Sequence, residues 1–186
     1  MHAEVDAHRT GHHRAKFVVV GGPGADKSTV AGKLESMFDI ENIELDDLWW
    51  ETEWRQAGAA VLRSRLEERI QQAQGWIIDG TYLAELDATD LWGAADRVVW
   101  LDLPRSVCFR RAVLRNVWRI VSRQRLWSGN REPLSNLGPY SLYSLWCRWP
   151  AYSAAIEASL PGFSPGQLVR LRSQREISAW LLSLRE

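Results

Sequence analysis

A glycine-rich stretch, GGPGADKST at 21–29, contains the residue types that bind phosphate groups. It follows an apolar β-branched run at 17–20 and precedes a helical pattern that begins at Lys27. This context fits the phosphate-binding loop G-x-x-x-x-G-K-[ST], in which backbone N–H groups and a helix N-terminus bind phosphate oxygens. We therefore expect every residue of the stretch to contact a nucleotide: Gly21, Gly22, Pro23, Gly24, Ala25, Asp26, Lys27, Ser28 and Thr29.

Two side chains of this loop have a chemical role in phosphate and metal binding, and a third residue departs from the motif. Lys27 would neutralise phosphate charge, and the Ser28 hydroxyl would bind Mg²⁺. Asp26 occupies the position of the second glycine, where it adds a Cβ and a carboxylate. At about 5 Å and an effective dielectric near 20, repulsion from a phosphate charge is roughly 3 kcal/mol. Asp26 is thus expected to weaken nucleotide binding, unless its carboxylate turns towards the metal; a loop that no longer binds nucleotide is the alternative.

Acidic residues follow two further apolar runs. Asp79 follows the run at 76–78, and Asp46 and Asp47 follow the run at 43–45. The carboxyl ends of parallel strands meet at one edge of a sheet, where ligands bind. Asp79 is therefore a candidate Mg²⁺ ligand together with Ser28, and Asp46 a candidate general base for an acceptor hydroxyl. A strand-end turn at Asp79 and a helix N-cap at Asp46 or Asp47 are the structural alternatives.

Residues 103–131 contain eight arginines and no acidic residue. Such a segment, placed over a phosphate site, would neutralise the charge that develops during phosphoryl transfer. A basic face paired with acids elsewhere in the fold is a second interpretation. A third is a nucleic-acid surface with Trp118 and Trp127 as stacking platforms. Four of the arginines recur at every fourth residue, the spacing of one helix face: Arg111, Arg115, Arg119 and Arg123.

Short apolar runs alternate with amphipathic helical patterns along the chain. This alternation is typical of βαβ units, and it predicts an α/β domain with a parallel sheet covered on both faces. Strands are expected at 17–20, 43–45, 76–78, 97–101 and 168–171, and helices at 27–38, 59–73, 104–120, 141–159 (one or two helices) and 174–184.

The amino-acid composition limits which other classes of protein are compatible with the sequence. The 186 residues fit one domain, and equal totals of 23 basic and 23 acidic residues give no indication of a partner. Two cysteines and no long apolar run argue against a disulfide framework and a membrane span, and the N-terminus lacks the apolar core of a signal peptide. A cytoplasmic setting is expected. All histidines lie within residues 1–13, which excludes histidine catalysis in the rest of the chain.

The chain resembles a bacterial P-loop kinase-like family described as adenylate kinase-related or DNA topology modulation protein. The resemblance implies a P-loop NTPase three-layer fold with a five-stranded parallel sheet, similar to adenylate kinase, spanning 16–186 after a flexible tail at 1–15. It also implies ATP, Mg²⁺ and a helical arginine-rich lid at about 111–140 that includes Arg111 and Arg115. Five segments carry it: GGPGADKST, ELDDLWW, GWIIDGTY, RVVWLDLPRSVCFRRAVLR and LVRLRSQREISAWL.

One departure from this family concerns the acceptor. The stretch DGTYLAEL, which begins at Asp79, has no arginine where nucleotide kinases often place one for the acceptor phosphate. A neutral hydroxyl acceptor is thereby favoured over a nucleoside monophosphate. The expected function is ATP-dependent phosphoryl transfer to a small molecule or nucleotide, and the alternatives are a non-catalytic binding protein and a nucleic-acid binder. The expected site comprises Lys27, Asp46, Arg111, Arg115 and Arg119 in catalysis, and Ser28 and Asp79 at the metal.

Overall fold

The computed structural model describes residues 14–82, 85–86, 92–159, 164 and 166–185. The expected tail at 1–15 lies outside these residues except for its last two positions. Within the described ranges, no helix is both long enough and apolar enough to cross a membrane.

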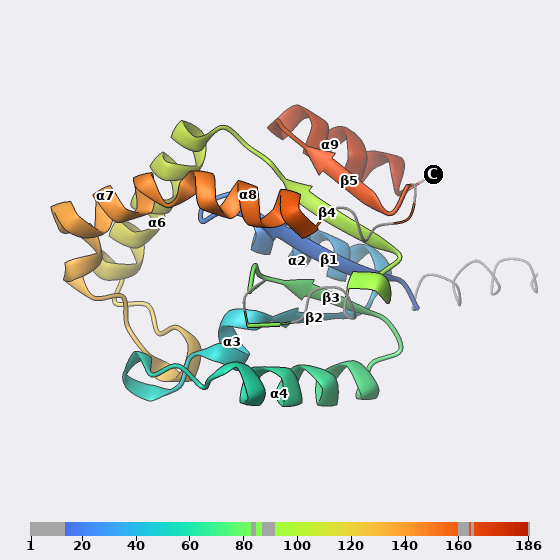
Figure 1. The fold of residues 1–186 in the computed structure, drawn as a ribbon, viewed down its shortest axis with the longest axis horizontal. Coiled ribbons are helices and arrows are strands. Elements are labelled where there is room, and N and C mark those ends of the chain that lie inside the picture. The colour runs from blue at the N-terminus through green and yellow to red at the C-terminus, as the bar shows by residue number, and fades with distance from the viewer. Residues whose placement is uncertain (1–13, 83–84, 87–91, 160–163, 165, 186) are drawn as a thin grey trace, which may run out of the picture.

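Five parallel strands form one sheet at the centre of the molecule (Figure 1). Their order is β2-β3-β1-β4-β5, so the strand that enters the glycine-rich loop lies in the middle. Every neighbouring pair is parallel, which confirms the predicted sheet. The strands are β1 Lys16–Gly21, β2 Glu41–Glu44, β3 Trp76–Asp79, β4 Arg97–Leu101 and β5 Leu168–Leu171.

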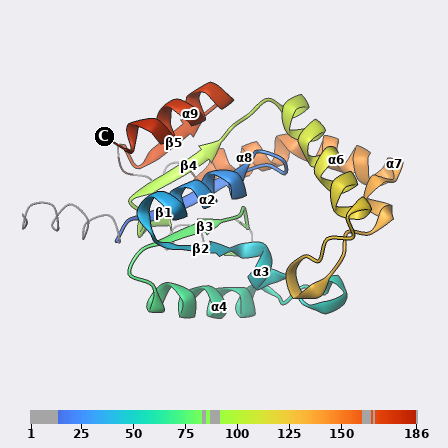
Figure 2. The same ribbon diagram turned by 180° about the vertical axis from the view of Figure 1, so that it is seen from behind.

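Helices cover both faces of this sheet, as Figures 1 and 2 show from opposite sides. Side chains alternate along β1: Val19 packs in the cluster that includes helices α2 and α9, whereas Val18 and Val20 pack in the cluster that includes α3, α4 and α8. The alternation follows from the two-residue period of a strand. The helices are α2 Lys27–Phe38, α3 Leu45–Trp49, α4 Ala59–Gln72, α6 Arg105–Val121, α7 Pro139–Cys147, α8 Trp149–Ser159 and α9 Gln174–Ser183.

The second strand differs from the prediction. β2 ends at Glu44, and Leu45 begins α3 because Leu45, Leu48 and Trp49 have the spacing of one buried helix face. Asp46 and Asp47 consequently lie in the first turn of α3, where their charges suit the helix dipole. The N-cap is Glu44, so the N-cap interpretation of these two aspartates is wrong.

The predicted lid at about 111–140 covers most of α6, the residues that follow it and the start of α7, and this region projects beyond the carboxyl ends of the strands (Figure 1). Residues 122–138 connect α6 to α7 and are called the lid segment. They contain the 3₁₀ turns η2 Trp127–Gly129 and η3 Leu134–Leu137. The segment at 141–159, for which one or two helices were expected, forms two, α7 and α8. Arg123 follows the end of α6 with φ 49°, so it does not continue the helical row of arginines.

Candidate active site

Asp26 occupies a left-handed backbone position, with φ 70° and ψ 23°. Glycine adopts this conformation at no steric cost, whereas among other residues aspartate and asparagine are enriched there. The loop thus keeps the conformation that a second glycine would give it, despite the Cβ of Asp26. The substitution changes the charge of the loop rather than its backbone path.

The backbone of the loop presents free donors at the N-terminus of α2. Within the described part of the chain, the N–H groups of Gly24, Asp26 and Lys27 donate to no protein acceptor, whereas the N–H of Ala25 donates to the Gly22 carbonyl at 3.1 Å. α2 also carries no acidic residue in its first turn. Free N–H groups at the positive end of a helix form an anion-binding arrangement.

Two glycines allow neighbouring elements to enclose this loop. A Cβ on Gly22 would lie 2.4 Å from the ring of Trp149 on α8, and a Cβ on Gly24 would lie 2.2 Å from the carbonyl oxygen of Cys108 on α6. At its start, Gly21 is held by Thr81, whose Oγ1 accepts from the Gly21 N–H at 3.2 Å and donates to the Gly21 carbonyl at 3.0 Å. The loop is therefore fixed in place by contacts from α6, α8 and the residues after β3.

The carboxylate of Asp26 turns towards α6. Its Oδ2 accepts a hydrogen bond from Nη1 of Arg111 at 2.8 Å, and Nη2 of the same guanidinium donates to Gln174 at 3.1 Å. We expected the charge of Asp26 to be offset only by a metal, and this expectation was incomplete. The sequence separation of 85 residues between the partners concealed the ion pair.

Lys27 is the cation at the centre of the site. Its side chain is half-buried, and Nζ donates to the Gly22 carbonyl at 3.4 Å. Burial lowers the pKa of Lys27, and the carboxylates of Asp79 and Asp46 oppose this shift. The ammonium group therefore lies in the electrostatic field of two carboxylates and donates its hydrogen bond within the described residues to the loop backbone, as suits a group that binds a polyanion.

Asp79 ends β3 beside Ser28. It is 5% exposed, and desolvation raises the pKa of Asp79, whereas the charge of Lys27 and a hydrogen bond with Ser28 lower it. This pair of oxygen ligands suits Mg²⁺, since the buried carboxylate lacks solvent to stabilise its charge. Three or more metal-binding acidic, histidine or cysteine side chains do not cluster anywhere in the described ranges. A bound Mg²⁺ would therefore complete its shell with phosphate oxygens and water.

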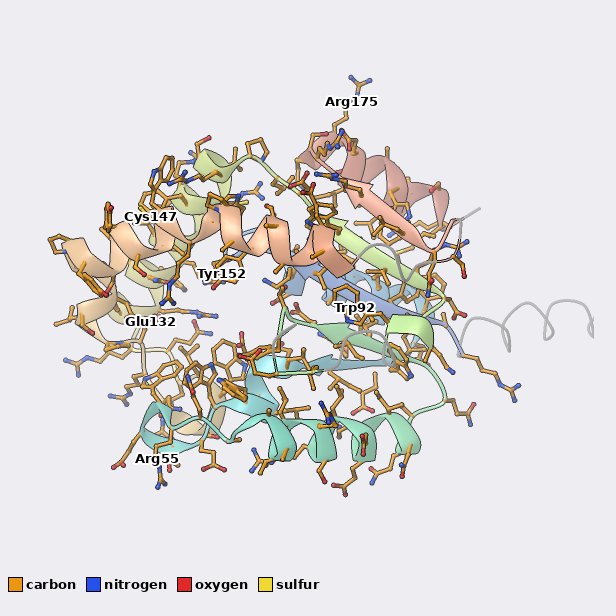
Figure 3. All side chains as sticks on the ribbon, in the orientation of Figure 1. Arg55, Trp92, Glu132, Cys147, Tyr152 and Arg175 are labelled. Atoms are coloured by element: carbon orange, nitrogen blue, oxygen red, sulfur yellow. The ribbon has the colours of Figure 1, made fainter. Side chains whose placement is uncertain are left out.

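A cavity of about 730 Å³ opens beside the loop. Lys27, Asp46 and Arg115 line it together, although they come from three elements. Tyr152 extends from α8 on the side that faces α3 (Figure 3) and lines the same cavity. The structure thus brings together three of the predicted catalytic side chains and adds aromatic residues that the sequence did not indicate.

The arginines of α6 take separate positions. Arg115 lines the cavity, and no hydrogen bond or ion pair joins it to another described residue. Its side chain remains accessible, yet enough protein surrounds the guanidinium for desolvation, followed by the charge of Arg119, to lower the pKa of Arg115. Arg119 does not line the cavity; it pairs with Glu132 at 3.6 Å and lies over the Trp127 ring at 5.3 Å. Arg119 therefore does not belong to the group of side chains that line the cavity.

Sequence reasoning missed Tyr82. Its hydroxyl donates a hydrogen bond to Oδ1 of Asp46, and its ring packs on Trp49 at 5.4 Å between centroids. Burial raises the pKa of Tyr82, and Asp46 raises it further, so the phenol stays protonated and acts as a donor. Its position two residues after Gly80, in the stretch that lacks the expected arginine, was a signal that could have identified it.

The five-stranded parallel sheet and the loop between β1 and α2 match the P-loop NTPase α/β fold. The chain is similar to shikimate kinase from Bacteroides thetaiotaomicron, with a TM-score of 0.54 and 18% identity over 92% of this chain and 96% of that one. At this identity the likeness shows the fold alone. No protein-family model matches the chain, and no curated protein sequence matches it.

Proposed function

We propose that this chain is an ATP-dependent phosphotransferase that transfers the γ-phosphoryl group to a hydroxyl of a small molecule. The observation that carries the proposal is that Lys27, Asp46 and Arg115 open into one cavity beside the phosphate-binding loop. The fold of a kinase supports the general class. The narrower assignment to the adenylate kinase-related family and a cytoplasmic location remain predictions from the sequence.

The loop would bind the triphosphate. The free N–H groups of Gly24, Asp26 and Lys27 would donate to phosphate oxygens, and Lys27 would neutralise charge on the β and γ phosphates. Ser28 and Asp79 would hold Mg²⁺, which supplies positive charge to the transferring group when bound. Arg115, which has no partner among the described residues, would contact the charge that develops at the γ-phosphoryl group.

Asp46 would accept the acceptor's proton. One of its oxygens is engaged by Tyr82, and the other is left for the acceptor hydroxyl. In the transfer step the hydroxyl oxygen forms a bond to the γ-phosphorus, and the bond from the β,γ-bridging oxygen to that phosphorus breaks. ADP leaves with the electron pair of the broken bond, and the hydroxyl proton passes to Asp46 and then to solvent.

The two other functions inferred from the sequence receive less support. Of the two expected stacking platforms for nucleic acid, Trp118 is exposed, but Trp127 is engaged: its Nε1 donates to Glu44 at 3.0 Å and its ring lies under Arg119. For a loop that lost nucleotide binding, Asp26 would have to leave an uncompensated negative charge. Arg111 supplies the opposite charge at 2.8 Å.

Titration of ATP·Mg²⁺ into the chain by calorimetry tests the proposal. We expect binding by the unmodified chain and loss of at least about tenfold in affinity in Lys27→Met, which keeps the length of the side chain but removes its charge. Lys33→Met, on the same helix and outside the cavity, is the matched control. Absence of ATP binding by the unmodified chain would contradict the proposed function.

A further inference from the structure

The cavity beside the phosphate loop has two ends with different chemistry. Gly21, Lys27 and Arg115 line the end at the loop, which suits phosphate. The far end lies between α3, α8 and the residues after β3. Its walls consist of four aromatic side chains and two polar ones, Trp49, Trp50, Tyr82, Tyr152, Gln56 and Glu85.

Asp46 and Tyr82 form a hydrogen-bonded pair in the wall of this cavity. Asp46 is close enough to Lys27 for its charge to act on the ammonium group, and it accepts the hydrogen bond of the Tyr82 hydroxyl. The charges of Glu85 and Tyr152 also raise the pKa of Tyr82, and both residues line the same cavity. An acceptor whose hydroxyl meets Asp46 therefore lies in the same cavity as Glu85.

The charges of the far end disfavour an anionic acceptor. Asp46 and Glu85 are both half-buried carboxylates, and like charges disfavour a phosphate or carboxylate placed between them. Besides Lys27 and Arg115, one more cationic side chain among the described residues lines the cavity: Arg148, which precedes Trp149, whose ring packs at Gly22 of the loop. Arg148 is exposed to solvent at the junction of α7 and α8, where water and salt screen its charge.

The aromatic walls supply what a cation needs. Trp50 and Tyr152 are half-buried and line the cavity with Glu85, and aromatic faces attract ammonium groups through the ring quadrupole. A partly enclosed carboxylate adds a charge-assisted hydrogen bond. An apolar acceptor would leave Glu85 without a partner, whereas an ammonium group satisfies both features at once.

We propose that the acceptor is a hydroxyl compound with a protonated amine, an amino sugar or amino alcohol, whose ammonium group binds Glu85 between Trp50 and Tyr152. This inference rests on the proposed function. The hydroxyl of such a compound meets Asp46 while the ammonium group occupies the far end. Glu85 is then a specificity-determining residue that takes no part in the transfer itself.

ADP formation with two matched sets of acceptors tests this inference. One set is glucosamine, glucose and glucose-6-phosphate, and the other is serinol, glycerol and glycerol phosphate. We expect kcat/KM for the amine of at least one set to exceed that for its neutral and phosphorylated counterparts by about tenfold or more. Preference for a neutral or phosphorylated member, or no turnover of either amine by a chain that binds ATP·Mg²⁺, would overturn the acceptor class and leave the nucleotide site standing. Failure to bind ATP·Mg²⁺ would instead overturn the proposed function.

Glu85→Gln separates recognition from general damage to the site. This isosteric change removes the charge and keeps the side-chain size, so we expect kcat/KM for the preferred amine to fall by about tenfold. The loss of kcat/KM for the neutral member of the same set should be smaller than the loss for the amine, and calorimetry with ATP·Mg²⁺ reports any damage to the nucleotide site. Glu67→Gln, an exposed glutamate on α4, is the matched control. Equal losses for amine and neutral acceptors in Glu85→Gln would contradict the role of Glu85.

Discussion

The carboxylate of Asp26 and the guanidinium of Arg111 lie 2.8 Å apart and join the phosphate loop to α6. The pair places a cation beside the one residue of the loop that departs from the usual motif. About a third of each side chain remains exposed, so solvent weakens the interaction, and its importance lies in the local charge rather than in stability.

We expect Arg111→Ala to weaken ATP·Mg²⁺ binding by about 10- to 100-fold, because the carboxylate of Asp26 would then repel the phosphates without compensation. The double variant Asp26→Gly/Arg111→Ala should recover much of this loss, and Asp26→Gly alone should change the affinity little. Calorimetry on the double-mutant cycle measures these effects. Arg110→Ala, the exposed neighbour on α6, is the control. Equal losses with and without Asp26 would show that Arg111 acts independently of the loop carboxylate.

The backbone position of Asp26 gives a separate prediction for stability. The left-handed conformation costs alanine about 1–2 kcal/mol of steric energy, whereas glycine adopts it without this cost. Asp26→Ala should therefore lower the free energy of unfolding by about 1 kcal/mol relative to Asp26→Gly in urea denaturation. Asp39 is also left-handed, at the C-terminus of α2 with φ 52°, so the pair Asp39→Ala and Asp39→Gly should show the same difference. Equal stability of the alanine and glycine variants at position 26 would contradict the assigned conformation.

Asn130 connects the lid segment by hydrogen bonds to the residues around η1 Thr52–Trp54. It is 7% exposed, its Nδ2 donates to the Glu51 carbonyl at 2.7 Å, and its Oδ1 accepts from the Trp54 N–H at 3.2 Å. Asn130→Ala leaves two partly buried backbone groups without this partner, which costs about 1 kcal/mol. We expect faster amide hydrogen exchange in both 50–56 and 122–138.

The control for this experiment lies in the same segment. The Asn136 side chain donates to Glu132, four residues earlier in the same segment, so Asn136→Ala should leave exchange at 50–56 unchanged. Unchanged exchange at 50–56 in Asn130→Ala would show that the lid segment is held by other contacts. The Trp127 and Ser128 hydrogen bonds to Glu44 and Trp50 would then be the next to remove.

Burial of Asp79 predicts a pH dependence of stability. The native carboxyl binds its proton more tightly than the unfolded one, because desolvation raises the pKa of Asp79 above the ordinary 3.8. The resulting stabilisation of the native state is complete at pH values below the ordinary pKa, and it is lost as pH rises through the raised native pKa. The stability of Asp79→Asn relative to the parent should therefore be greater above this pH range than below it. Urea denaturation across acidic to neutral pH measures this, with the exposed Asp47→Asn as the control.

The two cysteines should differ in reactivity. Cys108 is fully buried, and desolvation raises the pKa of its thiol to about 11, whereas Cys147 is exposed. Because thiolates are the reactive species, iodoacetamide at pH 8 should label Cys147 and leave Cys108 unmodified until the chain unfolds. Mass spectrometry of the labelled peptides distinguishes the sites. Labelling of native Cys108 at a rate similar to that of Cys147 would contradict the packing of α6 on the loop.

Local sequence determined the sheet and the phosphate loop. The strands at 97–101 and 168–171 and the helix at 27–38 have the predicted bounds, because apolar runs and helical periodicity are properties of neighbouring residues. The strand at 43–45 was displaced because Leu45 packs with Leu48 and Trp49 as a helix face. A short apolar run is compatible with either element until tertiary packing selects one.

Tertiary structure alone decided which charges meet. The sequence showed an aspartate in the loop and a row of arginines, but the pairing of Asp26 with Arg111 and of Arg119 with Glu132 depends on how α6 crosses the loop. The same applies to Tyr82, which meets Asp46 because the residues after β2 and β3 lie at one sheet edge. Residue types and spacing specify what each group can do, and distances between segments far apart in the chain specify which groups do it together.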